Sequence, residues 1–516
     1  MTNSNSETYD IIVIGGGATG LGIALESASR GYRTLVVEAY DYGKGTSSKS
    51  TKLVHGGIRY LANLDFALVK EGLEERYYFI NNAPHLAKAQ TYLIPFQNVK
   101  EKIKYWLGIK IYDSLAGKLK LGKSRFLSKE ETLREAPDLA SEKIIGGAVY
   151  LDGQFDDTRL LITLVKTFET LGGTALNYTK VTDFTYADNK QINGIIAKNQ
   201  LNEETKTYSA KHIINATGTF SDSIMNLAEK NTEHKNVAAA QGTHLVFDKE
   251  IFNSDHAILI PETGDGRVLF ILPWHDKALV GTTDIKVSEP TLDPQAQENE
   301  IDFILEVLSE YCNKPVSRHD IKSVFSGQRP LVKSTKDKNT AKISRKHEIF
   351  ETSNGLVTMA GGKWTIYRRM GQDTIDYLEK TRELHKTQSR THHLRLFGYT
   401  TEKIPYPLGI YGTARDEVVK IQHELNNFQL LHNELPYFQA EVIYHVRHEH
   451  ARTVEDILAR RTRALFINSK AALASAATVA SLMANELGYD HLWQQQQLKQ
   501  LMIEGAKYSI GNNAAS

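Results

Sequence analysis

The first forty residues alternate short apolar runs with polar or glycine-rich stretches. Residues 9–14 and 34–37 are apolar runs typical of buried strands. Between them, the apolar positions over residues 21–25 indicate a helix. A strand, a helix and a second strand in this order predict one unit of a parallel sheet at the start of the chain.

A glycine-rich turn joins the first predicted strand to the helix. It contains Gly15, Gly17 and Gly20, and Glu38 ends the second strand 18 positions later. In a dinucleotide-binding fold the first glycine permits a tight turn, the second lets the backbone approach a pyrophosphate, and the third brings helix and strand together. A carboxylate at this spacing binds the ribose hydroxyls of an adenosine. The pattern predicts a dinucleotide site without separating NAD from FAD.

Later apolar runs predict a return to this sheet and then a second sheet. Further strands of the first region are expected at residues 144–150, 192–197 and 211–218. Antiparallel strands of a substrate-binding domain are expected at residues 243–247, 268–274 and 278–284. Arg329 and Arg345 each accompany an apolar stretch, and Lys363 precedes a helical pattern that begins near Thr365. That turn resembles the opening of a helix pointed at an anion or a flavin ring.

From about Leu394 the pattern becomes helical. Helical periods occur over residues 416–421, 441–446, 471–487 and 494–507. The same region carries a charge run from Arg460 to Arg463. Such a run is more often a solvated face or an internal ion-pair network than a contact for a partner, a regulator or a second subunit.

Composition excludes several classes of protein. The 516 residues are long enough for two or three domains, and 62 basic residues against 61 acidic ones give no field to attract nucleic acid. Cys312 is the single cysteine, which excludes an intramolecular disulfide, a thiolate metal cluster and a redox cysteine pair, and no metal site is expected. The polar N-terminus does not indicate secretion, and no long uncharged apolar run indicates a membrane span.

A basic and aromatic segment leaves two interpretations open. Residues 100–125 hold eight basic and two acidic side chains, with Tyr105, Trp106 and Tyr112 among them. This composition suits the interface of an anionic membrane. It equally suits a solvated helical hairpin that packs its apolar side inward.

Several motifs together resemble the FAD-dependent glycerol-3-phosphate dehydrogenases, the aerobic respiratory enzymes. One is the block Ser-Thr-Lys-Leu-Val-His-Gly-Gly-Ile-Arg-Tyr at residues 50–60. The others, in order, are residues 46–48, 83–86, 215–218, 273–274, 281–284, 326–331 and 361–368. Residues 445–463 are similar to the C-terminal helical domain of that family.

The resemblance implies FAD as cofactor and glycerol 3-phosphate as substrate, with a hydride passing from C2 of the substrate to N5 of the flavin. Oxidation of a secondary alcohol also needs a base and donors for the phosphate. The implied catalytic residues are His244, His55, Arg329 and Lys363, with His244 slightly favoured over His55 as the base. The implied substrate-binding residues are Arg59, Tyr60, Arg329, Arg345 and Lys363. The implied cofactor-binding residues are Gly15, Gly17, Gly20, Glu38, Thr46, Ser47, Ser48, Lys52, Leu53, His55, Gly218, Gly362, Lys363 and Thr365.

The identity of the electron acceptor distinguishes a dehydrogenase from an oxidase. A membrane quinone implies a cytoplasmic protein held peripherally on the inner face of the cytoplasmic membrane, with residues 100–125 as its contact. Oxygen as acceptor implies an alpha-glycerophosphate oxidase that produces hydrogen peroxide. We expect the dehydrogenase, because the oxidases tend to carry an extra insert that this compact sequence lacks. A non-catalytic FAD-binding partner protein is a further alternative, and a homodimer stays open.

The expected fold class is α/β: a Rossmann-like FAD-binding domain, an antiparallel-sheet substrate domain and a C-terminal α-helical domain, as in flavoproteins of the glutathione-reductase and D-amino-acid-oxidase type. The oxidoreductase region is predicted at residues 1–393 and the helical domain at 394–516. The predicted FAD-binding segments are about 8–95, 140–220 and 350–390. The predicted substrate-binding segments are about 96–139 and 221–349.

Overall fold

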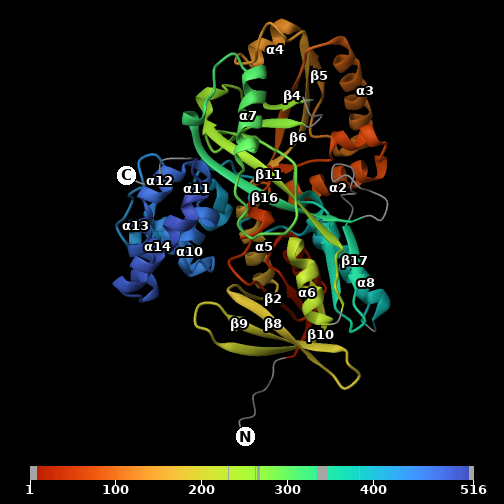
Figure 1. The fold of residues 1–516 in the computed structure, drawn as a ribbon, viewed down its shortest axis with the longest axis vertical. Helices are drawn as coiled ribbons and strands as arrows, with labels where there is room; N and C mark the ends of the chain where they lie inside the picture. Colours follow the sequence, from red (N-terminus) through yellow and green to blue (C-terminus); the bar gives the residue numbers. More distant parts are fainter. Residues whose placement is uncertain are drawn as a thin grey trace.

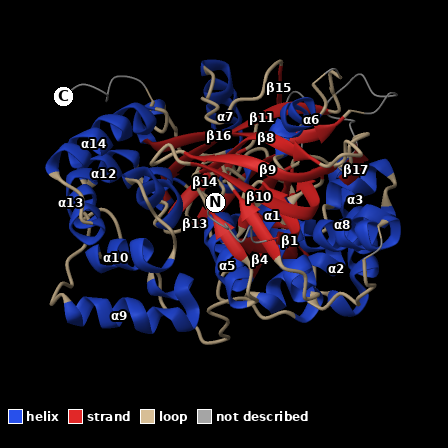
Figure 2. Cartoon of the chain, turned by 90° about the horizontal axis from the view of Figure 1, so that it is seen from below, coloured by secondary structure: helices blue, strands red, loops and turns tan. Residues whose placement is uncertain are grey.

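The chain folds around two β-sheets, with a helical C-terminal domain packed to one side of them (Figure 1). The computed structural model describes residues 8–230, 232–261, 263, 268–333, 347–382 and 384–510, without the side chains of residues 59, 62 and 63. Figure 2 shows helices flanking the strands on both sides, with α9, α10, α13 and α14 grouped at one end. Within the described ranges, no helix combines the length and the apolar character needed to cross a membrane.

The first sheet is built around the N-terminal strand. Its order is β17-β18-β10-β1-β2-β7, and the pairs of β1 with β2 and with β10 are parallel. A hairpin of β8 and β9 continues from β10. The strands are β1 (Thr8–Ile14), β2 (Thr34–Val37), β7 (Thr174–Leu176), β8 (Thr179–Tyr186), β9 (Ile192–Asn199), β10 (Thr205–Asn215), β17 (His347–Glu351) and β18 (Val357–Gly361).

The second sheet is mostly antiparallel. Its order is β15-β11-β14-β13-β12-β4-β6-β3, with β16 paired to β11 and β5 to β6. The long β11–β16 pair places His244 opposite Phe325 and Arg329 opposite Ala240. The strands are β3 (Leu53–Val54), β4 (Ala87–Phe96), β5 (Arg125–Leu127), β6 (Gly146–Phe155), β11 (Val237–Asp248), β12 (Ala257–Ile260), β13 (Leu269–Trp274), β14 (Lys277–Gly281), β15 (Ile285–Val287) and β16 (Ile321–Val332).

Helices cover the sheets and form the C-terminal domain. Those of the first part are α1 (Ala18–Ser29), α2 (Phe66–Asn82), α3 (Val99–Ala116), α4 (Lys129–Glu135), α5 (Asp157–Thr170), α6 (Ser221–Ala228), α7 (Glu298–Tyr311) and α8 (Tyr367–Thr381). Those of the C-terminal domain are α9 (Arg415–Glu424), α10 (Gln439–His448), α11 (Ala464–Ile467), α12 (Ser469–Ala474), α13 (Ala476–Leu487) and α14 (His491–Ala506). A π-helix, Asp456–Arg461, precedes α11.

Close packing of α1 on α8 follows from two glycines. A Cβ on Gly22 or on Gly371 would overlap backbone of the facing helix, at Tyr367 and at Gly22 respectively. The two helices therefore approach backbone to backbone, which fixes α8 against the first unit of the dinucleotide fold although more than 300 residues separate them in sequence.

The fold class expected from the sequence is confirmed, and two details differ from expectation. The strand expected at residues 144–150 is part of β6, which lies with β4 in the second sheet rather than in the first. β4 and β6 pair with each other along their whole length, and β12, which pairs with β4, connects them to the other strands of the second sheet. The segment at 100–125 forms the single helix α3, a short 3₁₀ turn and the start of β5 rather than a helical hairpin.

Candidate active site

A cavity of about 780 Å³ is lined by residues of both sheets. On the first sheet it meets the turns that follow β1, β2 and β18, and on the second sheet it meets β11 and β16. The carboxyl ends of parallel strands are the usual place for a ligand in such a fold. The cavity therefore joins the predicted cofactor turn to the predicted substrate domain.

The glycine turn forms one end of this cavity. Gly15 has φ +112°, and a Cβ there would lie 2.7 Å from the carbonyl oxygen of Ala216. A Cβ on Gly20 would overlap the carbonyl oxygen of Gly15. Gly17 is the N-cap of α1 and provides no side-chain cap, and Gly17, Ala18 and Thr19 line the cavity, so the N-terminus of this helix borders the space that the glycines leave.

Glu38 closes the same end. Its Oε2 accepts a hydrogen bond from the Gly16 amide at 2.7 Å, and its Oε1 accepts one from the Tyr40 amide at 3.0 Å. Burial raises the pKa of this carboxyl, although the two backbone amides act in the opposite direction. The two amides fix the carboxylate where a ribose hydroxyl could donate to it.

The segment from Thr46 to Ser48 connects the two sheets along the cavity. Ser47 Oγ accepts a hydrogen bond from the Ala18 amide at 3.0 Å, and the Ser47 carbonyl accepts one from the Trp364 indole at 2.9 Å. Thr46 Oγ1 donates to the Gln328 carbonyl at 2.5 Å. Thr46 and Ser47 line the cavity, whereas Ser48 is buried behind them.

Lys52 lies behind the lining as well, although Leu53 beside it faces the cavity. Its ammonium is fully buried and donates to Asp157 at 2.5 Å and to the Ser48 carbonyl at 3.0 Å. Burial lowers the pKa of Lys52 to about 8, although the negative charge of Asp157 acts to raise it. This geometry makes Lys52 a support for the cavity wall rather than a cavity-facing side chain.

His244 lies on β11 with its ring enclosed. Nε2 is 2.9 Å from Thr51 Oγ1, the ring stacks on Phe325 at 4.8 Å, and Nδ1 is buried without a hydrogen-bond partner among the described residues. A Cβ on Gly281 would lie 2.5 Å from the ring, so that glycine makes room for it. Burial, with the charges of Lys52 and Arg329, holds the pKa of His244 well below its usual value. The imidazole is therefore neutral at physiological pH.

Arg329 lies on β16 and reaches into the cavity. Its guanidinium donates to Thr282 Oγ1 at 3.0 Å and lies 3.3 Å from an Asp284 carboxylate oxygen. A Cβ on Gly242 of the facing strand would lie 2.5 Å from the guanidinium, so this glycine leaves the space that the side chain occupies. The arginine thus presents a positioned cation within the same cavity as His244.

The turn after β18 brings the remaining predicted residues together. Lys363 Nζ lies 4.9 Å from the centre of the Tyr60 ring, and both residues line the cavity. The His55 amide donates to Thr365 Oγ1 at 3.3 Å, which ties the segment after β3 to this turn. Gly362 adopts φ +74°, the left-handed region in which glycine is favoured.

The structure places most of the predicted site residues on one cavity. Those that line it are Gly15, Gly17, Glu38, Thr46, Ser47, Leu53, His55, Tyr60, Gly218, His244, Arg329, Gly362, Lys363 and Thr365. Gly20, Ser48 and Lys52 lie behind the lining. The Arg59 side chain and Arg345 lie outside the described residues. The roles of all these residues toward cofactor and substrate stay predictions.

Three residues that shape the cavity were not predicted. Thr51 holds the ring of His244, and Gly242 and Gly281 leave the space for Arg329 and His244. Thr51 lies inside the block at residues 50–60, and an isolated glycine within a strand pattern signals a close approach of neighbouring groups. Those two signals were available, but the pairing of β11 with β14 and β16 was needed to interpret them.

Two family models match the chain in succession. Residues 10–368 match the FAD dependent oxidoreductase model, and residues 357–495 match the C-terminal domain of alpha-glycerophosphate oxidase. The cavity fits FAD, because its glycine cradle admits a pyrophosphate, Glu38 is fixed for a ribose, and the remaining length extends to the second sheet. The cofactor is therefore FAD, and the nicotinamide alternative falls away.

Solved structures and curated relatives agree with this assignment. The glycerol-3-phosphate dehydrogenase of Bacillus halodurans, solved with FAD, has a TM-score of 0.80 and 28% identity over 97% of this chain and 95% of its own. The L-alpha-glycerophosphate oxidase of Mycoplasma pneumoniae shares the fold at a TM-score of 0.59 and 20% identity, over 72% of this chain and 95% of its own. The mitochondrial glycerol-3-phosphate dehydrogenases of Arabidopsis thaliana and Homo sapiens are 37% and 36% identical over 96% and 97% of this chain, and over 85% and 73% of their own lengths. The chain belongs to the FAD-dependent oxidoreductases and, within them, to the glycerol-3-phosphate dehydrogenase family.

Proposed function

We propose that this protein oxidises sn-glycerol 3-phosphate to dihydroxyacetone phosphate and passes the electrons to a membrane quinone. One observation carries the substrate assignment. Two cations, Arg329 and Lys363, line the same cavity as a neutral buried imidazole and the FAD-binding turn. A small phosphorylated alcohol needs this combination, and the names of the relatives support the same substrate.

The phosphate is held by the cations of the second sheet and of the turn after β18. Arg329 supplies a planar fork that suits a phosphate dianion, and Lys363 supplies a compact charge beside Tyr60. Arg59 and Arg345 are proposed as further phosphate contacts. FAD, when bound, supplies the acceptor for the hydride that leaves C2.

His244 is the proposed base for the hydroxyl proton. Its depressed pKa keeps the ring in the form that accepts a proton, and the Thr51 hydroxyl fixes its orientation through Nε2. His55 lines the same cavity and is the second candidate. Glu38, Gly15 and Gly17 hold the adenosine half of the cofactor, so that the substrate residues meet its other end.

Anaerobic reduction tests the substrate assignment. The FAD-loaded protein is mixed with glycerol 3-phosphate, with glycerol or with NADH, and the flavin absorbance is followed. We expect bleaching by glycerol 3-phosphate alone. No bleaching by any of the three would leave only a non-catalytic FAD-binding protein, and bleaching by NADH would indicate a reductase.

A membrane contact is part of the proposal, with α3 as its surface. Four apolar side chains of this helix stand in solvent: Val99, Ile103, Trp106 and Leu107 are 63%, 63%, 48% and 54% exposed. Lysines alternate with them along the helix. This combination suits the headgroup region of an anionic membrane on the cytoplasmic face.

Vesicle binding tests the surface. The FAD-loaded protein is sedimented with vesicles that contain phosphatidylglycerol, and the bound fraction is compared for wild type and for the triple variant K100Q, K102Q and K104Q. We expect the variant to lose most binding. A matched triple variant on the C-terminal domain, K420Q, K470Q and K499Q, is the control, and equal binding by both variants would contradict the assignment of α3.

An oxidase is the second candidate, because the C-terminal residues match the domain named for alpha-glycerophosphate oxidase. With glycerol 3-phosphate as donor, oxygen or a soluble quinone is offered as the sole acceptor, and peroxide is measured. Quinone reduction that is faster than peroxide formation supports the dehydrogenase. The reverse order assigns the oxidase.

A further inference from the structure

Three arginines of the C-terminal domain are buried. Arg460, Arg461 and Arg463 are 2%, 0% and 1% exposed, and they lie at the end of the π-helix Asp456–Arg461 and just beyond it. Burial of an unpaired guanidinium is very unfavourable, so each must find acceptors. The charge run is therefore an internal ion-pair network, one of the alternatives that its sequence left open.

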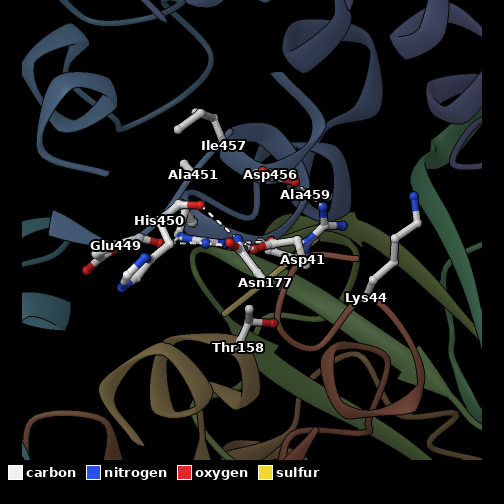
Figure 3. A network of polar contacts seen from close by, with 12 residues as sticks. Asp41, Lys44, Thr158, Asn177, Glu449, His450, Ala451, Asp456, Ile457 and Ala459 are labelled. Atoms are coloured by element: carbon white, nitrogen blue, oxygen red, sulfur yellow. Dashed lines mark hydrogen bonds and ion pairs between the residues drawn. The ribbon is translucent and has the colours of Figure 1, made fainter. Parts of the chain in front are cut away.

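The principal acceptor comes from the other end of the chain. Asp41 accepts hydrogen bonds from Arg460 Nε at 2.5 Å and from Arg461 Nη1 and Nη2 at 2.7 and 2.8 Å (Figure 3). Burial alone would raise the pKa of Asp41, but the two guanidinium groups hold it far below its usual value. Asp41 lies three residues after Glu38, in the turn that borders the cofactor cavity.

The same turn, residues 41–48, is held at two further points. Lys44 Nζ pairs with Glu455 Oε2 at 2.8 Å. Arg463 donates to the Ser48 carbonyl at 2.7 Å and to Thr158 Oγ1 at 2.9 Å. Between these anchors, Gly43, Gly45, Thr46 and Ser47 line the cavity. One face of the turn therefore meets the cofactor space and the other meets the C-terminal domain.

A second set of bonds docks the arginine segment on the first part of the chain. Arg159 of α5 makes a two-bond pair with the Glu449 carboxylate, each at 2.7 Å, and Asn177 donates to the His450 carbonyl at 2.9 Å. Arg461 Nη2 also donates to the Glu449 carbonyl at 2.6 Å. The segment that holds Arg461 is thus docked on α5 and on Asn177, the residue after β7, and Figure 3 shows Asn177 beside His450 and Asp41.

We propose that Arg460, Arg461 and Arg463 are positioning residues for the FAD site: the C-terminal domain holds the turn at residues 41–48 in the conformation that receives the cofactor. Binding of FAD and docking of the C-terminal domain are then coupled, and each strengthens the other by the same factor. The inference depends on FAD binding and is independent of the substrate assignment.

The test measures FAD affinity directly. Apoprotein is titrated with FAD, and quenching of flavin fluorescence gives the dissociation constant well below the unfolding temperature. Arg461→Lys keeps the charge and removes the fork that binds Asp41 twice, and we expect at least tenfold weaker FAD binding. Arg447→Lys is the matched control, because Arg447 pairs with Glu486 within the C-terminal domain. Its FAD affinity is expected to equal that of the wild type.

Glu455→Gln is the milder variant and decides the question if Arg461→Lys does not fold. It removes one charge that faces both Lys44 and Arg460, and we expect severalfold weaker FAD binding. Hydrogen exchange over residues 452–463 supplies the reciprocal readout. FAD should slow exchange there in the wild type and slow it less in the variants.

One outcome overturns the proposal. If the arginines only stabilise the fold, the variants will have a lower unfolding temperature as apoprotein, but their FAD dissociation constant will stay within twofold of the wild-type value. Exchange over residues 452–463 would then also be insensitive to FAD in the wild type. Because no substrate is used, a failure of the glycerol 3-phosphate assignment would leave this result untouched.

Discussion

Replacement of Arg329 by methionine tests the phosphate-binding half of the active site. The Arg329 side chain is 24% exposed, and its guanidinium contacts Thr282 and Asp284 within the cavity. Methionine is unbranched like the stem of arginine and carries no charge, so it keeps the apolar stem and removes the guanidinium. A second variant, Gly242→Ala, keeps the charge and displaces it, because the new Cβ would lie 2.5 Å from the guanidinium.

The expected loss of kcat/KM follows from the hydrogen bonds that Arg329 would make to the phosphate of the substrate. A hydrogen bond to a charged group contributes about 1.5 to 3 kcal/mol, and a guanidinium fork makes two of them. The existing contact with Asp284 offsets part of this gain, so we take the lower end, about 3 kcal/mol in total. Since about 1.4 kcal/mol is a factor of ten, kcat/KM for glycerol 3-phosphate should fall about a hundredfold in Arg329→Met.

The assay separates binding from folding. Initial rates with a soluble dye as acceptor give kcat and KM, and inorganic phosphate as a competitive inhibitor gives a constant that should weaken by a similar factor. FAD content and unfolding temperature should stay unchanged. Arg318→Met, which removes an exposed arginine of the same domain paired with Glu298 and Asp302, is the control. A change below threefold in both KM and phosphate inhibition would refute the assignment of Arg329.

Three further outcomes are expected. His244→Gln should lower kcat by about 10² to 10⁴ with FAD retained, and a larger loss in His55→Gln would exchange their roles. Gly20→Ala should weaken FAD binding at least tenfold because its Cβ overlaps Gly15, whereas Gly108→Ala, with open space around its Cβ, should not. Burial raises the pKa of Glu441 from 4.5 to about 7, so its contribution to stability is present below pH 4.5 and is lost as the pH rises through 7. Glu441→Gln removes the ionisable group, so its effect on the free energy of unfolding should be more stabilising at pH 8 than at pH 5, by up to about 3 kcal/mol. Equal changes in unfolding temperature at the two pH values would contradict this.

The dinucleotide turn could be predicted because its chemistry is local. Gly15, Gly17, Gly20 and Glu38 lie within 24 residues, and each meets a requirement that the backbone sets within that stretch. The structure agrees down to the close approach of Gly20 to Gly15. Helices α9, α10, α13 and α14 were equally accessible, since their apolar period is carried by consecutive turns, whereas α11 and the π-helix before it were not predicted.

Sheet membership was less accessible, because pairing depends on distant partners. The sequence of β4 does not indicate that its neighbours are β6 and β12 rather than β1. For the same reason, the sequence could not predict the space that the Arg329 guanidinium occupies. The glycine that provides it, Gly242, faces Gly327 across β11 and β16, about 85 positions away in sequence.

The arginine cluster shows why a charge run is hard to interpret from sequence. Arg460 and Arg461 are separated from Asp41 by about 420 positions, and a run of cations has the same composition on a surface as in an interior. Burial distinguishes the two, since a buried guanidinium requires several acceptors and an exposed one requires none. Buried Arg461 donates to Asp41 and to the Glu449 carbonyl, whereas exposed Arg447 pairs with Glu424 and Glu486 of its own domain. Because two of the acceptors of the buried arginines, Asp41 and the Ser48 carbonyl, belong to the turn at residues 41–48, these arginines connect the C-terminal domain to the turn that borders the cofactor cavity.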